Sequence, residues 1–111
     1  MLPRNGKLLR IIIGESDRNE GLPLYEWIIK KAREEKLAGA SVFRGIEGFG
    51  ANSHLHTAKI LCLSQDLPIL IEIVDVEDKI NSFVDMIDPV IKEGIVTIEN
   101  VEVKFYRGKK K

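Results

Sequence analysis

The sequence predicts an α+β fold with the element order β-α-β-β-α-β, and three observations support this prediction. Two apolar, β-branched segments, residues 8–13 and 69–74, have the composition and alternation of strands. Residues 24–36 and 80–91 repeat apolar side chains at helical spacing. Shorter strand-like segments, at residues 40–45 and near the C-terminus, complete the order. This is the order of the ferredoxin-like sandwich, an antiparallel sheet with two helices on one face.

In the first half of the chain, residues 8–13 predict a strand closed by Gly14, and the polar residues 15–21 predict a loop. Pro23 suits the first turn of the helix that follows. Gly39 is expected to stop this helix before the second strand begins. The apolar positions that define the helix are Leu24, Ile28 and Ala32.

In the second half, a long excursion separates the second strand from the third, and residues 60–63 are a candidate short strand within it. Pro89 cannot donate to the helical hydrogen-bond ladder, so the second helix is expected to kink or restart there. Residues 95–98 and 101–105 are predicted as two closing strands around Glu99 and Asn100.

The composition indicates one domain over residues 1–111, with a core at about 8–106 and a basic tail at 107–111. Seventeen basic and seventeen acidic residues cancel, which argues against nucleic acid as a partner. The single cysteine, Cys62, excludes an intrachain disulfide and any multi-cysteine metal site. No signal peptide or apolar span of about 20 residues is visible, so we expect a cytoplasmic protein without membrane insertion.

The alternation in the central strands also predicts what each sheet face carries. The odd-numbered isoleucines and leucine should lie under the helices. The opposite face combines Arg10 and Glu72, which are expected to pair, with side chains too apolar to stand fully in water. Self-association is the simplest way to cover that face. Its apolar members are Leu8, Ile12, Leu70 and Val74.

Several short motifs, in their order and spacing, resemble a known group. They include residues 13–17 (Ile-Gly-Glu-Ser-Asp), 39–42 (Gly-Ala-Ser-Val), 44–50 (Arg-Gly-Ile-Glu-Gly-Phe-Gly), His56-Thr57 and Leu67-Pro68. The chain resembles the PII-like signalling superfamily, and more closely its branch of small PII-like proteins catalogued as a domain of unknown function. The resemblance covers roughly residues 8–106.

This resemblance implies a regulatory protein rather than an enzyme. It implies a homotrimer with an adenine nucleotide (AMP, ADP or ATP) in clefts between subunits and no required cofactor. The loop at residues 51–66 would contact a protein partner, such as a membrane transporter or an enzyme. Its partner-facing residues would be Asn52, His54, His56 and Lys59.

Carried over position by position, the resemblance places Ser41 at the adenine edge and the glycine pivot at 48–50 beside the nucleotide. Gly94 matches a turn glycine on the adenine side. The superfamily's phosphate-holding turn is absent, because residues 97–100 read Thr-Ile-Glu-Asn, and Arg107 is the preferred replacement cation. The full set of implied nucleotide-binding residues is Ser41, Gly48, Phe49, Gly50, Ala51, Gly94, Ile95, Val96 and Arg107.

Two other functions remain as alternatives. A structural or partner-binding trimer with a degenerate nucleotide site would explain the missing phosphate turn. A small phosphate-ester or acyl-phosphate hydrolase would need an anion-cradling loop at residues 14–18 and an asparagine that the sequence does not supply after the second strand. His54 and His56 could hold a metal with Glu47 or Asp66, but two histidines without a clear third ligand predict no metal site.

Overall fold

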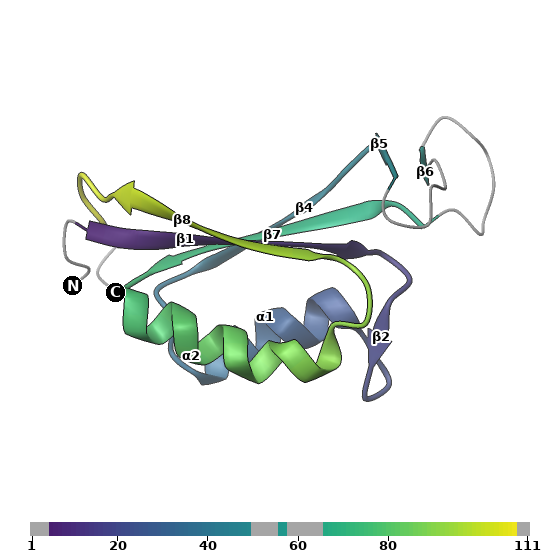
Figure 1. Cartoon of the computed structure of the whole chain (residues 1–111), viewed down its shortest axis with the longest axis horizontal. Coiled ribbons are helices and arrows are strands. Elements are labelled where there is room, and N and C mark those ends of the chain that lie inside the picture. The colour runs from purple at the N-terminus through teal and green to yellow at the C-terminus, as the bar shows by residue number, and fades with distance from the viewer. Residues whose placement is uncertain (1–4, 50–55, 58–65, 109–111) are drawn as a thin grey trace.

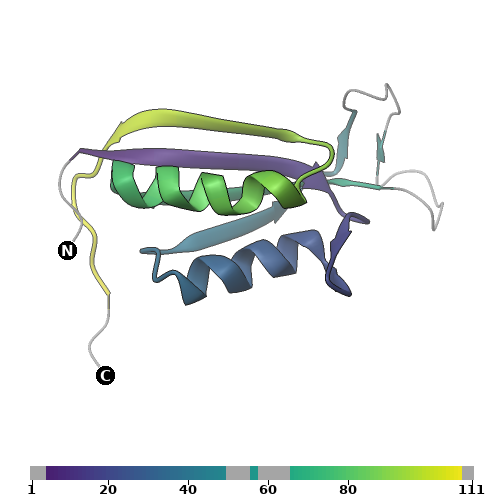
Figure 2. The same cartoon turned by 60° about the horizontal axis from the view of Figure 1, so that its bottom comes forward.

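A computed structural model of the chain describes residues 5–49, 56–57 and 66–108. Four strands form one antiparallel sheet, in the spatial order β4 (Ala40–Arg44), β7 (Pro68–Asp75), β1 (Asn5–Gly14) and β8 (Ile95–Glu102). The same face of this sheet is covered by the helices α1 (Leu24–Glu34) and α2 (Glu77–Ile87), as Figures 1 and 2 show. The architecture confirms the predicted ferredoxin-like fold.

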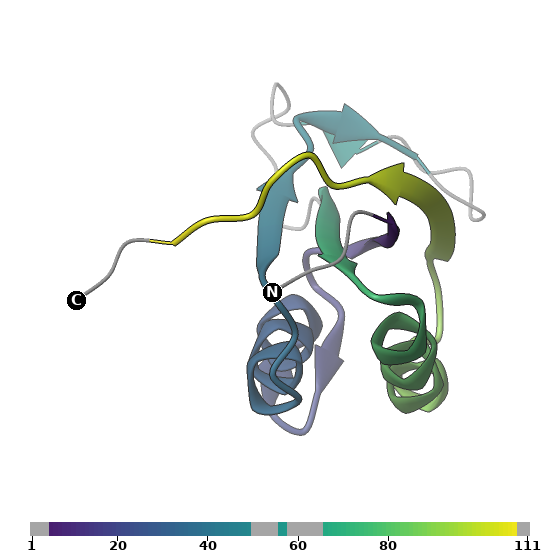
Figure 3. The ribbon, with the colours of Figure 1, turned by 90° about the vertical axis from the view of Figure 1, so that its left-hand side faces the viewer.

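The core lies between this face and the helices. Side chains of β1 and β7 alternate as the sequence predicts, and the odd-numbered isoleucines and leucine are at most 3% exposed. Each helix contributes one apolar stripe to the same layer. Figure 3 shows the two helices end-on beneath the sheet. The buried core comprises Leu9, Ile11, Ile13, Ile69, Ile71 and Ile73 from the strands, and Leu24, Ile28, Ala32, Ile80, Phe83 and Ile87 from the helices.

Where residues 15–21 were predicted as a loop, the chain forms a small hairpin of β2 (Arg18–Asn19) and β3 (Leu22–Pro23). Its two turn residues have positive φ, 52° at Glu20 and 80° at Gly21. A side-chain contact holds the turn against α1, since Trp27 Nε1 donates to Glu20 Oε2 at 2.6 Å. A second small pairing joins β5 (Glu47–Gly48) to β6 (His56–Thr57).

Helix α1 ends at Glu34. The prediction that Gly39 stops this helix is wrong, because the helix has already ended before that glycine. Lys36 takes the left-handed conformation with φ of 60°. Its N–H donates to Arg33 O at 3.1 Å, and the next N–H, of Leu37, donates to Ala32 O at 3.1 Å. These two bonds form a Schellman motif, which usually places glycine at the position that lysine occupies here.

The predicted irregularity at Pro89 is a change of helix type: α2 ends at Ile87 and a single 3₁₀ turn, η1 (Asp88–Val90), follows. The prediction of two closing strands is wrong. Strand β8 runs without a break through Glu99 and Asn100, because both are exposed on an edge strand where polar side chains cost little. Residues 103–108 belong to no strand, and the short strand predicted at 60–63 lies outside the described residues.

Within the described ranges, no helix combines the length and the apolar character that crossing a membrane requires.

Candidate functional site

The face of the sheet opposite the helices carries side chains in rows that run across all four strands. The first, here called the apolar row, is set by the register Ile95–Ile12–Leu70–Phe43. Ile12, Phe43 and Ile95 are 40%, 49% and 54% exposed. In water such a row of large apolar side chains is a surface that favours association.

The next row, here called the polar row, has the register Thr97–Arg10–Glu72–Ser41. Arg10 Nε donates to Glu72 Oε2 at 2.9 Å, which confirms the predicted pair, and Arg10 Nη1 donates to Glu99 Oε1 at 2.5 Å. The hydrogen bond to Glu72, and then the negative charges of Glu99 and Glu72, raise the pKa of Arg10 against the opposing effect of desolvation. One cation therefore joins two carboxylates on this face, next to the apolar row.

Both ends of the long excursion between β4 and β7 are fastened at one end of the sheet. On the outgoing side, Gly45 N–H donates to Pro68 O at 2.7 Å, and Arg44 forms an ion pair with Glu15. On the returning side, Glu15 N–H donates to Leu67 O at 2.8 Å. The turn after β1 thus contacts both ends of the excursion.

Asp66 completes this fastening, and the sequence did not reveal its role. Ser16 N–H donates to Asp66 Oδ1 at 2.7 Å. A Cβ on Gly14 would lie 2.3 Å from Asp66 Oδ2, so the glycine leaves the space that the carboxylate occupies. The available signal was the glycine that closes β1, directly before three polar residues.

Asp17 shapes the turn from inside. Its Oδ2 accepts a hydrogen bond from Gly14 N–H at 3.0 Å, and its carbonyl accepts one from Leu24 N–H at 2.7 Å. Burial, followed by the charges of Asp66 and Glu93, raises the pKa of Asp17, while the Gly14 N–H lowers it. The carboxylate is therefore held in the turn at an electrostatic cost.

Ser41 and the segment around Gly94 lie on opposite edges of the sheet. Ser41 is exposed on β4, whereas Ile95 and Val96 begin β8, with β7 and β1 between them. Ile95 belongs to the apolar row, and Val96 faces α2 on the other side of the sheet. One chain alone does not bring Ser41 and this segment together.

The fold itself explains why position 94 is a glycine. Its φ is +139°, and a Cβ there would lie 2.4 Å from the carbonyl oxygen of Ile12. The turn into β8 therefore needs glycine because the backbone of β1 passes directly beside it.

The predicted glycine pivot is described only in part. Gly48 pairs with His56 in the β5–β6 ladder and does not have a left-handed φ, so its substitution is not expected to strain the backbone for that reason. Phe49 is 72% exposed, which leaves its ring accessible to a ligand or a partner. The other members of the predicted set, Gly50, Ala51, Asn52, His54 and Lys59, lie outside the described residues.

Residues 103–108 cross the end of the sheet remote from the long excursion and extend past β4, as Figure 3 shows. Tyr106 Oη donates to Ala38 O at 2.5 Å and ties the segment to its own chain. The Arg107 guanidinium carbon lies 4.1 Å from the centre of the Phe105 ring. Within one chain, Arg107 and the described part of the pivot, Gly48 and Phe49, are thus at opposite ends of the sheet.

Most of this chain matches a known protein family. The model of DUF190, described as an uncharacterized family, matches residues 6–103. The chain belongs to this family. One relative, a UPF0166 protein of Aquifex aeolicus, is 40% identical over 97 residues. The match covers 87% of this chain and 91% of the relative.

Solved structures similar to this DUF190 chain include PII-like proteins. CPII from Thiomonas intermedia K12, described as a nitrogen regulatory PII-like protein bound to ADP, AMP and bicarbonate, has a TM-score of 0.69 at 17% identity, covering 89% of this chain and 88% of that one. A PII-like signaling protein from Thermus thermophilus has a TM-score of 0.64 at 18% identity and covers 93% of both chains. At these identities the likeness shows a PII-like fold.

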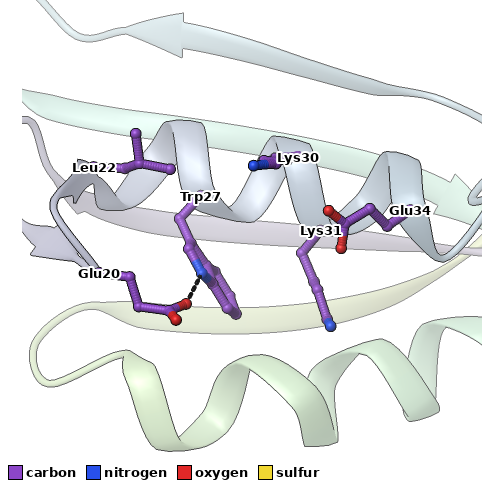
Figure 4. Close-up of a pocket in the computed structure, with 6 residues that line it drawn as sticks. All are labelled: Glu20, Leu22, Trp27, Lys30, Lys31 and Glu34. Atoms are coloured by element: carbon purple, nitrogen blue, oxygen red, sulfur yellow. Dashed lines mark hydrogen bonds between the residues drawn. The ribbon is translucent and has the colours of Figure 1, made fainter.

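The described surface of the DUF190 chain is hollowed beside each of its two helices. One hollow, of about 320 Å³, lies beside α1 and the β2–β3 hairpin. Figure 4 shows Trp27 and Lys31 extending from α1 in the same direction, with Glu20 at the indole nitrogen. Its charges are mixed, two lysines and two glutamates, and so they do not select an anion. Its lining residues are Glu20, Leu22, Trp27, Lys30, Lys31 and Glu34.

The second hollow, here called the α2–β8 groove, has a volume of about 400 Å³ and runs between α2 and the edge strand β8. All but one of its lining residues are aliphatic, and the exception is Asp88 at the start of η1. Its lining is Val84, Ile87, Asp88, Ile91, Val96 and Ile98.

Proposed function

We propose that this protein is a PII-like regulatory protein, a homotrimer that binds an adenine nucleotide in the clefts between its subunits. The loop at residues 51–66 would then be presented to a protein partner. The family, the PII-like fold and the ADP and AMP bound to CPII support this proposal.

The observation that carries the proposal is the sheet face opposite the helices. Its apolar row is exposed in one chain, and burying it requires another surface of the same shape and character. Ser41 and Gly94 flank this face from opposite edges. In a ring of subunits the Ser41 edge of one chain meets the Gly94 edge of the next, and the two halves of the predicted adenine site come together there.

The proposed contacts follow from the chemistry of each group. The Ser41 hydroxyl can donate to and accept from the edge of adenine. Backbone N–H groups of the 48–51 segment would approach the ribose and phosphates. Arg44 is paired with Glu15, and Arg107, the cation preferred from the sequence, is the proposed phosphate ligand.

Calorimetric titration with AMP, ADP and ATP, with and without Mg²⁺, tests the proposal when the mass in solution is measured on the same sample by light scattering. We expect a trimer that binds about one nucleotide per subunit. A well-folded trimer that binds none of the three would favour a structural or partner-binding trimer with a degenerate site.

Ser41→Ala should weaken nucleotide binding about fivefold, because it removes one hydrogen bond worth roughly 1 kcal/mol. Ser82→Ala is the matched control, since it removes an exposed hydroxyl on α2, away from the sheet face. Equal affinity of the two variants would contradict the assignment of Ser41.

The regulatory part of the proposal depends on a response of the 51–66 loop. A nucleotide that contacts the 48–51 segment differently in two loop conformations will shift the population between them. We expect hydrogen exchange of the amides in residues 51–66 to change when saturating nucleotide is added. Unchanged exchange in a nucleotide-bound trimer would contradict the switch while leaving binding intact.

A further inference from the structure

We infer that Arg10, Glu72 and Glu99, here called the charged cluster, determine how many copies of this chain associate through the sheet face opposite the helices, and that they select three copies rather than two. This inference rests on the self-association proposed above. The apolar row attracts any second copy of the face, whereas the charged cluster restricts how the copies can be arranged.

The charged cluster lies near the middle of the sheet face. Arg10 is on β1 and Glu72 on β7, which are the two central strands of the sheet. Glu99 belongs to the next row, with the register Glu99–Leu8–Val74, and Arg10 reaches it from the polar row. The side chains of Arg10, Glu72 and Glu99 are 41%, 30% and 55% exposed in one chain. A copy that covers the apolar row must therefore also approach the charged cluster.

The charged cluster has one excess negative charge, because one guanidinium faces two carboxylates. Within the four strands of the described sheet, no other charged side chain shares this face, since the alternation of the strands puts the rest on the side of the helices. Those on the helix side are Lys7, Arg44, Asp75 and Glu102. Two copies of the face thus bring two like charges together, and the strands supply no further cation to neutralise them.

A face-to-face pair is the arrangement that the charged cluster opposes. Two sheet faces stacked about a twofold axis would bury the middle of each face against the middle of the other. That removes water from both clusters and places their excess negative charges close together in a medium of low dielectric constant. A pair would cover the apolar row, but only by burying charge without compensation.

A ring of three leaves the middle of each face in a different environment. The β4 edge of one chain meets the β8 edge of the next, so the contacts form toward the edges, and the central strands β7 and β1 turn toward the axis. Three inclined faces leave most room near their common axis, where Arg10, Glu72 and Glu99 keep part of their water. The charged cluster therefore disfavours the competing pair more than the ring, which is how a repulsive element produces specificity.

Neutral side chains of similar size in place of the charged cluster test the inference. The triple variant Arg10→Met, Glu72→Gln, Glu99→Gln removes all three charges and changes side-chain volume little. Native mass spectrometry and sedimentation velocity over a range of protein concentrations measure the masses present, and far-UV circular dichroism checks folding. The natural protein should show monomers and trimers, and the variant should show dimers, alone or beside trimers. A folded variant that forms no dimer would overturn the inference.

A single substitution makes the same test with less disturbance of the fold. Glu99→Gln removes the excess charge and keeps the hydrogen bond from Arg10 to Glu72. Dimers are expected again, in a smaller proportion than in the triple variant, because an ion pair must still lose water. Glu34→Gln is the matched control, since it removes one exposed carboxylate from α1, and it should form no dimer. Absence of dimers in Glu99→Gln, or dimers in the control, would refute the role of the cluster.

The masses of the natural protein separate this inference from the proposed function. A natural trimer, together with cluster variants that also form only trimers, would refute the role of the charged cluster and leave the proposed function standing. A natural protein that is a monomer or a dimer at all concentrations would refute both.

Discussion

Asp17 gives stability an unusual dependence on pH for an acidic residue. Because its pKa is raised in the folded chain, its contribution is most favourable below the ordinary carboxyl pKa and declines as pH rises through the folded pKa. Asp17→Asn keeps an oxygen for the Gly14 N–H and removes the charge. We therefore expect the variant to be more stable than the natural protein at pH 7, with the difference shrinking at acidic pH.

Urea unfolding of both proteins between pH 7 and about pH 3 would measure this difference. The difference should persist at about 1 M salt, because burial rather than the charges of Asp66 and Glu93 is its larger cause. A variant that is less stable than the natural protein at pH 7, or a stability difference that grows on acidification, would contradict the raised pKa assigned to Asp17.

Single residues in this chain were predictable where one physical constraint acts on them. Arg10 and Glu72 could be paired from the sequence because both stand among apolar residues at matching places on neighbouring strands. The role of Asp66 was not predictable, since its partner, Ser16, is fifty residues away and the contact is to a backbone N–H. A backbone donor leaves no signature in the side chains of a sequence.

Helix α1 offers a prediction at the level of an element. Its Schellman motif places Lys36 at φ of 60°, where a Cβ costs roughly 1–2 kcal/mol. Lys36→Gly should therefore raise the free energy of unfolding by about 0.5–1 kcal/mol, once the greater unfolded-state entropy of glycine is deducted. Thermal or urea unfolding measures the change.

The matched control is Lys30→Gly in the middle of the same helix. There the backbone is helical, so glycine should lower the free energy of unfolding by about 0.5–1 kcal/mol. Opposite signs at the two positions are the expected outcome. Destabilisation at both would show that the end of α1 does not carry the strain described.

The elements that the sequence predicted correctly are those with strong periodicity. Strands β1 and β7 alternate apolar side chains along their central residues, and both helices keep one apolar stripe. Strand β8 was divided in error because an edge strand tolerates Glu99 and Asn100 on its exposed positions. The β2–β3 hairpin was missed because Glu-Gly is a less common turn pair than Asn-Gly or Asp-Gly, and each strand has two residues.

For the whole molecule, the apolar row predicts how association responds to substitution. Phe43→Ser removes the largest exposed side chain of that row, and dissociation of the proposed trimer should shift to at least roughly tenfold higher concentration. Folding of the subunit should change little, since the ring is about half exposed in one chain. Sedimentation equilibrium measures the shift.

Met86→Ser is the control for this prediction, because Met86 is also a partly exposed apolar residue but lies on α2, away from the sheet face. The proposed trimer of the Met86→Ser variant should dissociate at an unchanged concentration. Equal effects of the two substitutions would mean that exposed apolar surface in general, rather than the apolar row, drives association.

The candidate site was less predictable than the fold, because it depends on the arrangement of the whole molecule. The resemblance indicated which residues to consider, including Ser41 and Arg107. The sequence could not show that Ser41 and the segment around Gly94 lie on opposite edges of the sheet. Nor could it show that Arg107 lies at the end remote from Gly48, because residues 103–108 turn back across the sheet only after β8 ends. A site divided between copies, as proposed above, would be defined by packing that a single chain does not encode locally.

The fastening of both ends of the long excursion has a consequence for how such proteins diversify. Gly45 is held by Pro68 and Leu67 by the turn after β1, so the points where the excursion leaves and rejoins the sheet are fixed. Closing a longer flexible loop between fixed ends costs only about 0.6 kcal/mol for each doubling of its length. Residues between the two anchors can therefore be lengthened, shortened or exchanged over generations, while the sheet and its two helices are inherited unchanged.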